Sequence, residues 1–269
     1  MTRIAYPSDL SDTEWELIEE LFPPPSPIGR PVEIALREVV NAIFYWCDNG
    51  IKWRALPHDF PCWSTVYDYF RRWVKTGLWE QINQQLVGKV RQAQGRKASP
   101  TLVIIDSQSV EGTSKGGAER GVDGFKKVKG RKRHAVTDVL GLVLNCFVGA
   151  ANQADVKAAP AALVPVLDTY ETIEKILADQ GYPGGIAEQL KAAYGCIFEL
   201  TKKLGDGFVV QPWRWVVERT FSWLENARRL CRDYEEIPEN HEAVVYIAMI
   251  RLMLRRLTDN RRKRKQKLA

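Results

Sequence analysis

Residues 102–109 read Leu-Val-Ile-Ile-Asp-Ser-Gln-Ser, an apolar run that ends in an acid and three polar residues. Four consecutive apolar residues are typical of a strand buried on both faces in the centre of an α/β sheet. Residues 176–179, Ile-Leu-Ala-Asp, have the same arrangement. Because α/β sheets place their sites beyond the carboxyl ends of strands, we expect Asp106 and Asp179 at one such edge. For either acid alone, a helix or turn cap is the simpler interpretation.

The rest of the C-terminal two thirds of the chain continues this pattern. Hydrophobic periodicity and turn residues predict further strands over 133–138, 142–150, 173–177 and 196–200. They predict helices over 155–170, 185–194, 213–232 and 242–257. Three strands in succession, followed by strands that alternate with helices, indicate an α/β fold with a mixed five-stranded sheet and flanking helices.

The first 95 residues differ, because their pattern is helical and aromatic throughout. Ser11 and Glu14 form a capping box, and further helices are predicted over 33–48, from a cap at Ser64 to Gly77, and over 79–94. The third helix exposes Arg71 and Arg72, which is compatible with a helix-turn-helix DNA-binding domain and equally with any small helical bundle.

A polar break at 95–100 separates the two patterns. We therefore predict a helical DNA-binding domain over 1–95, a catalytic domain over 99–258 and a basic tail over 259–269.

Composition and charge narrow the class of protein. The chain has 269 residues, of which 45% are hydrophobic and 27% charged, as in ordinary globular proteins. It has no apolar run long enough for a membrane span and no signal peptide, so we expect no membrane partner. The five cysteines are scattered without any CxxC, which argues against disulfides and zinc and favours a cytoplasmic location.

The formal net charge of +6 is concentrated in two places. Nine Lys and Arg residues follow from Arg251 onward against one acid. Six of eight consecutive residues are cations in the other run: Lys126, Lys127, Lys129, Arg131, Lys132 and Arg133. Such density predicts a polyanionic partner, since each cation can neutralise a phosphate; a solvated face and a disordered tail are the alternative.

Glu218 is a third candidate acid, on the predicted helix over 213–232. At about 100° per residue, Arg214 and Trp215 lie near it around the helix, and an apolar stripe through Val217 and Phe221 adjoins it. Three carboxylates with no His or Cys nearby suit Mg²⁺, and Mn²⁺ can substitute. Two such ions about 4 Å apart can promote phosphoryl transfer.

Several stretches together resemble one family, the DDE transposases of bacterial insertion sequences, and especially the group typified by insertion sequence five. They are YPSDLSDTEWELI, GIKWRALPHDFPCWSTVY, FRRW, IIDSQSV, KGRKRHAVTDVLGL, ADQGY and WVVERTFSWLENARRL, which together cover nearly the whole chain. The resemblance implies a ribonuclease H-like core, a catalytic and metal-binding triad of Asp106, Asp179 and Glu218, and two Mg²⁺ ions.

It further implies the partners and the place of action: double-stranded DNA, as terminal inverted repeats and target, a homo-oligomer such as a dimer on that DNA, and the bacterial nucleoid. Arg214 and the 126–133 run would bind phosphates, and Trp215 would stack on a base or pack in the core.

The signature around Glu218 departs from the wider group at two positions. Gln211 stands at its Tyr position and Glu225 at its Lys position, and Arg228 and Arg229 can supply the missing positive charge one turn later. The expected function is therefore a transposase that binds inverted repeats, cuts them and transfers strands. A structure-selective nuclease or resolvase on the same fold, and a non-catalytic DNA-binding regulator, are the alternatives.

Overall fold

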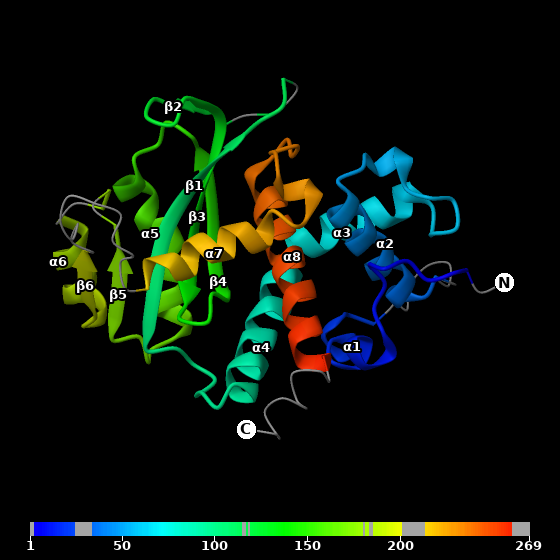
Figure 1. The fold of residues 1–269 in the computed structure, drawn as a ribbon, viewed down its shortest axis with the longest axis horizontal. Helices are drawn as coiled ribbons and strands as arrows, with labels where there is room; N and C mark the ends of the chain where they lie inside the picture. Colours follow the sequence, from blue (N-terminus) through cyan, green and yellow to red (C-terminus); the bar gives the residue numbers. More distant parts are fainter. Residues whose placement is uncertain are drawn as a thin grey trace.

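The computed structural model describes residues 3–24, 34–114, 117, 119–179, 181–182, 185–200 and 213–259, except for the side chain of Arg214. Figure 1 shows a twisted sheet flanked by helices at one end of the molecule, a group of helices at the other, and α4 and α8 between them. Within the described ranges, no helix is both long and apolar enough to cross a membrane.

The helices are α1 (Asp12–Glu16), α2 (Leu36–Asn49), α3 (Trp63–Lys75), α4 (Leu78–Ala93), α5 (Asp155–Thr169), α6 (Gly185–Tyr194), α7 (Arg214–Leu224) and α8 (Pro238–Thr258). Three single-turn 3₁₀ helices are η1 (Glu19–Leu21), η2 (Trp53–Ala55) and η3 (Arg228–Leu230). The strands are β1 (Leu102–Glu111), β2 (Gly121–Asp123), β3 (Val128–Asp138), β4 (Val143–Ala150), β5 (Lys175–Ala178) and β6 (Ile197–Leu200).

The N-terminal region is helical, as predicted, and it closes on an aromatic core. Trp46, Trp73 and Trp79 are buried, and the ring of Phe22 lies 5.0 Å from that of Trp73. The predicted capping box at Ser11 forms at the start of α1. The predicted cap at Ser64 is wrong.

Helix α3 starts earlier than predicted, because its first helical hydrogen bond runs from the Val66 N–H to the Cys62 carbonyl, 3.1 Å away. Cys62 is therefore the N-cap.

Helix α8 joins the two ends of the molecule. It packs on α4, α2 and α3 on one side and on β4 on the other (Figure 1). Polar contacts also cross the predicted boundary near residue 95: Asn83 Nδ2 donates to the Val143 carbonyl at 2.7 Å, and Arg91 is paired with the buried Asp138. The division into 1–95, 99–258 and 259–269 stays a prediction, and residues 260–269 lie outside the described ranges.

The sheet has the order β2-β3-β1-β5-β6, with β4 also paired to β3. β1 runs antiparallel to β3 and parallel to β5, and β6 continues the parallel part. This mixed sheet, covered by helices, is the ribonuclease H-like α/β fold expected from the sequence. The short β2 makes it six-stranded where five strands were predicted, because residues 121–123 pair with the start of β3.

Among the predicted helices and strands, the helix over 213–232 differs most from the structure. α7 ends at Leu224, and a turn and η3 follow. The helix stops because Ala227 and Leu230 turn inward and are buried, and Arg229 packs its guanidinium over the ring of Trp46 at 4.4 Å. A continuing helix would carry these side chains past that surface.

Candidate active site

Asp106 and Asp179 lie beside each other, because β1 and β5 are parallel neighbours. Ile104 is in register with Leu177, and two further residues along each strand lead to the two acids. Both carboxylates line one small pocket, together with Ala178 of β5 and Val217 of α7. The sequence prediction that these two acids lie where the sheet places its site, each at the carboxyl end of an apolar strand, is consistent with this geometry.

The surrounding strands explain why the pocket opens at this level. Asp179 comes directly after β5, as expected, but Asp106 lies inside β1, which continues to Glu111. The prediction that the first strand ends before Asp106 is wrong, because β3 keeps pairing with β1 through Glu111. Beyond Asp106, β1 therefore keeps its β3 neighbour while β5 has ended, and among the described residues its other edge is next paired by Asp233, whose N–H donates to the Glu111 carbonyl at 2.9 Å.

Each of the two carboxylates is oriented by a backbone N–H that follows it closely in the chain. Asp106 Oδ1 accepts from the Ser107 N–H at 2.7 Å, and Asp179 Oδ1 accepts from the Gly181 N–H at 2.8 Å. A Cβ on Gly181 would come within 2.9 Å of Asp179 Oδ1, so a side chain there would displace this carboxylate oxygen.

Glu218 lies on α7, whose buried residues Val216 and Val217 face the sheet. Its own side chain is exposed, one position after the Val217 that lines the pocket. Within the part of the chain that the structure describes, no three His, Cys, Asp or Glu side chains converge closely enough to hold a metal ion. The structure thus brings two acids of the predicted triad together and carries the third on the adjoining helix.

A fourth acid, Asp155 at the start of α5, borders the same site. It accepts from Ser107 Oγ at 3.1 Å and pairs with Lys132 Nζ at 3.0 Å. Asp155 Oδ2 and Asp179 Oδ1 both lie about 3 Å from the position of a Cβ on Gly181, so these oxygens are at most about 6 Å apart. Sequence reasoning missed Asp155, because an acid at a helix start looks like an ordinary cap.

The acids give the site negative charge, and two buried side chains next to it have shifted pKa values. Tyr182 is fully buried, and its hydroxyl has no hydrogen-bond partner among the described residues. Burial raises the pKa of Tyr182, and the charges of Asp155, Asp106 and Asp179 raise it further. Burial also lowers the pKa of His134 to about 4, so its imidazole is neutral. Asp106 and Asp179 supply two carboxylates to one pocket, and carboxylate oxygens are the ligands that a hard divalent cation prefers.

The run of six cations divides in the structure. We call Lys126, Lys127 and Lys129 the outer lysines, because their side chains are exposed. We call the remaining three the inner cations, since all are buried in β3: Arg131, Lys132 and Arg133. Their burial counts against the prediction that the inner cations bind DNA phosphates, because each is engaged inside the protein.

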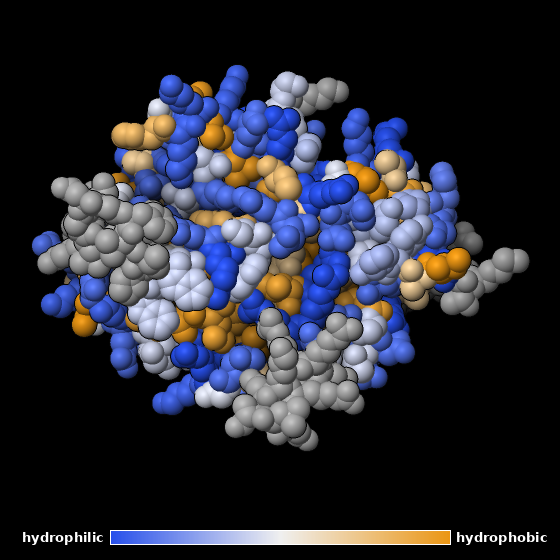
Figure 2. Space-filling view, in the orientation of Figure 1, coloured by the Kyte–Doolittle hydropathy of each residue, from blue (hydrophilic) through white to orange (hydrophobic). Residues whose placement is uncertain are grey.

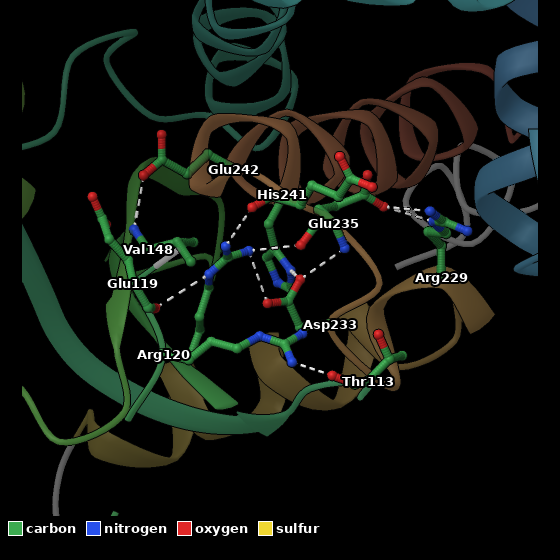
Figure 3. A network of polar contacts seen from close by, with 11 residues as sticks. Thr113, Glu119, Arg120, Val148, Arg229, Asp233, Glu235, His241 and Glu242 are labelled. Atoms are coloured by element: carbon green, nitrogen blue, oxygen red, sulfur yellow. Dashed lines mark hydrogen bonds and ion pairs between the residues drawn. The ribbon is translucent and has the colours of Figure 1, made fainter. Parts of the chain in front are cut away.

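Two of the inner cations are held by η3 and by the segment that follows it. Arg131 is fully buried, and its Nη1 lies 3.0 Å from Asp233 Oδ2. The Asp233 carboxylate also contacts His241 Nδ1 at 2.9 Å, within the polar network of Figure 3. Arg133 donates to the Leu230 carbonyl at 3.2 Å and to the side chain of Gln108.

The other predicted DNA contacts also divide by exposure. Arg71 and Arg72 are exposed on α3, and Arg228 and Trp215 are exposed near α7. Arg229 is the exception: it is buried and paired with Glu235 at 2.7 Å (Figure 3), which counts against its prediction as a DNA contact. The side chain of Arg214 and all of Gln211 lie outside what the structure describes.

Comparison with known proteins identifies the family. Residues 97–253 match the family described as "Transposase DDE domain", and residues 10–83 match "Putative transposase of IS4/5 family". The chain therefore belongs to the DDE transposase family.

Two similar proteins come from Burkholderia cepacia. One is "Insertion element IS402 uncharacterized 16.2 kDa protein", 32% identical over 40% of this chain and 76% of that protein. The other is "Putative transposase for insertion sequence element IS402", 30% identical over 42% of this chain and 58% of that protein.

Proposed function

We propose that this transposase binds the terminal inverted repeats of its insertion sequence, cuts DNA there with the help of divalent metal ions, and transfers the cut strand to target DNA. The observation that carries the proposal is the adjacency of Asp106 and Asp179 on parallel strands, with Val217 of α7 on the same pocket. Carboxylates so placed, in a family of DDE transposases, are suited to metal-assisted phosphoryl transfer.

Asp106, Asp179 and Glu218 are the proposed catalytic residues and metal ligands. Bound as a pair, Mg²⁺ ions would activate the attacking oxygen and stabilise the leaving one. The protein prepares this by fixing one oxygen of Asp106 and one of Asp179 with backbone N–H groups. Asp155 holds the positively charged Lys132 ammonium beside these acids, and it also accepts a hydrogen bond from Ser107, the residue after Asp106.

The exposed cations and one aromatic ring are the proposed DNA contacts. The outer lysines and Arg228 would bind phosphates, and Arg71 and Arg72 would reach DNA from α3. Trp215, whose ring is 45% exposed and covered on one side by the Arg219 guanidinium at 4.4 Å, would stack on a base. Arg214 stays a proposed phosphate contact, and the protein would act on DNA as a dimer.

The test uses the purified chain, Mg²⁺ and duplexes that carry the DNA flanking its coding sequence, with products mapped to the nucleotide. Asp106→Asn, Asp179→Asn and Glu218→Gln should each lower cleavage by about 100-fold or more, because each removes a charge that the transition state requires. Binding measured in Ca²⁺ should stay close to wild type. The exposed Glu188 on α6 gives the matched control, Glu188→Gln.

Three outcomes would count against parts of the proposal. A variant that cuts at nearly the wild-type rate removes that acid from the triad. Cut ends that stay unjoined indicate a nuclease or resolvase. Binding with no cleavage in any metal indicates a DNA-binding regulator.

A further inference from the structure

The hairpin between β2 and β3 presents one apolar side chain entirely to solvent. Phe125, in the turn after β2, has an exposed fraction of 101%, so the protein makes no use of its ring for packing. At the β2 end of the molecule, hydrophobic atoms stand among hydrophilic side chains (Figures 1 and 2). A single exposed apolar residue is ordinary by itself, and the surroundings of Phe125 are what distinguish it.

The turn that carries Phe125 is held in one conformation by Asp123. One carboxylate oxygen of Asp123 accepts from the backbone N–H groups of Phe125 and Lys126, each at 3.0 Å. Its other oxygen accepts from Ser109 Oγ of β1. Burial acts to raise the pKa of Asp123, but these hydrogen bonds outweigh it and the pKa is lowered, so the anchor stays charged. The ring is thus displayed by an ordered turn.

The same contacts bring the tip of the hairpin towards the candidate active site. Ser109, which holds Asp123, is three residues beyond Asp106 on β1, a distance of about 10 Å or three base-pair steps. Lys132 lies close enough to Asp123 to lower its pKa, and the same ammonium pairs with Asp155.

The charges around the ring match a phosphate backbone. Lys126 and Lys127, exposed beside Phe125, and Lys129 in the adjoining strand place positive charge next to an apolar tip. Proteins that kink duplex DNA combine these elements, an apolar wedge between base steps and cations for the flanking phosphates.

We propose that Phe125 inserts between neighbouring bases of the DNA end bound at the active site, with Lys126 and Lys127 on the adjacent phosphates. The inserted ring unstacks one base step and bends the duplex towards Asp106 and Asp179. This proposal rests on the proposed function, since it takes DNA as the substrate.

The experiment measures base unstacking directly. Duplexes from the DNA flanking the coding sequence carry 2-aminopurine at one position each, and the full chain is bound to them in Ca²⁺, so that no cleavage is needed. We expect a several-fold rise in fluorescence at one or two adjacent positions with the wild-type chain. Phe125→Ala should lose the rise at the same occupancy, and Phe125→Leu, which keeps an apolar wedge, should retain it.

Matched controls separate insertion from a general loss of binding. Ile197→Ala removes a 58% exposed apolar side chain from β6, at the opposite edge of the sheet, and should keep the rise. A rise that survives Phe125→Ala, or its absence at every position of a duplex that the wild type binds and cuts, overturns the proposal and leaves the proposed function standing. A chain that binds none of these duplexes overturns both.

Discussion

The outer lysines and the inner cations stand next to each other in the sequence and face opposite environments. Gly130 lies between the two groups. Only glycine fits there, because a Cβ would come within 2.1 Å of the Val110 carbonyl oxygen. Before it the chain forms the exposed hairpin, and after it the chain enters the centre of the sheet between β1 and β4. The difference teaches that positive charge in a sequence predicts a phosphate surface only where the backbone stays outside.

The largest effect expected from this contrast is on stability. Arg131→Ala should lower the free energy of unfolding by about 3–5 kcal/mol, because it leaves the fully buried Asp233 without its main cationic partner. Lys127→Ala, four positions earlier and exposed, should change it by less than about 0.5 kcal/mol. Urea unfolding of both variants makes the comparison. Equal decreases in the free energy of unfolding would mean that the inner cations contribute no more to stability than the outer lysines.

A smaller effect is expected at Glu242 of α8, a half-buried carboxyl that, unlike the acids paired with the inner cations, has no cationic partner among the described residues. Burial raises the pKa of Glu242 to about 7, and nearby acids add to the rise (Figure 3 shows its contact with Val148). A carboxyl whose folded pKa is raised favours the protonated native state. Deprotonation of Glu242 therefore lowers the free energy of unfolding as the pH rises from the ordinary carboxyl pKa of 4.5 through about 7.

Glu242→Gln should accordingly stabilise the protein by up to about 3 kcal/mol at about pH 8 and by almost nothing at about pH 4, since the pKa is raised from 4.5 to about 7 and each pKa unit corresponds to about 1.4 kcal/mol. The amide oxygen can still accept from the Val148 N–H, which lies 2.8 Å from the carboxylate. Thermal unfolding of both proteins across this range measures the difference. An equal gain at both pH values would show that charge is not its cause.

The smallest effect on stability is expected for the outer lysines. Replacing Lys126, Lys127 and Lys129 with Ala should leave the free energy of unfolding within about 0.5 kcal/mol of wild type. It should weaken binding to all DNA sequences about equally and flatten the slope of log K against log salt by roughly 0.9 per lost phosphate contact. Titrations at several salt concentrations decide this, and an unchanged slope would remove these lysines from the DNA surface.

Much of this architecture could be predicted from local pattern, and the exceptions have physical causes. The apolar run before Asp179 ends as predicted, since β5 ends at Ala178. Asp106 stays within its strand because β3 continues to pair with β1. The residues around Asp106 do not by themselves indicate this pairing with a distant segment.

The site was harder to predict than the fold. Burial of Arg131 depends on Asp233, and the place of Asp155 beside Asp179 depends on how α5 meets the turn at Gly181. Both are tertiary contacts between segments far apart in the chain, and nothing in the composition of the cationic run distinguishes a paired arginine from a solvated lysine. Exposure of Phe125, likewise, follows from the hairpin and not from the residue type.

The position of α8 has a consequence for the order of folding. Helices α2, α3 and α4 pack against α8, which leaves the ribosome about 145 residues after α4. At about 5–20 residues per second, the N-terminal helices wait roughly 7–30 s for that partner. During that interval their apolar faces are uncovered and available to chaperones or to a neighbouring nascent chain. The helices that are synthesised first are therefore among the last to be fully packed. Packing of the N-terminal region thus depends on synthesis of α8.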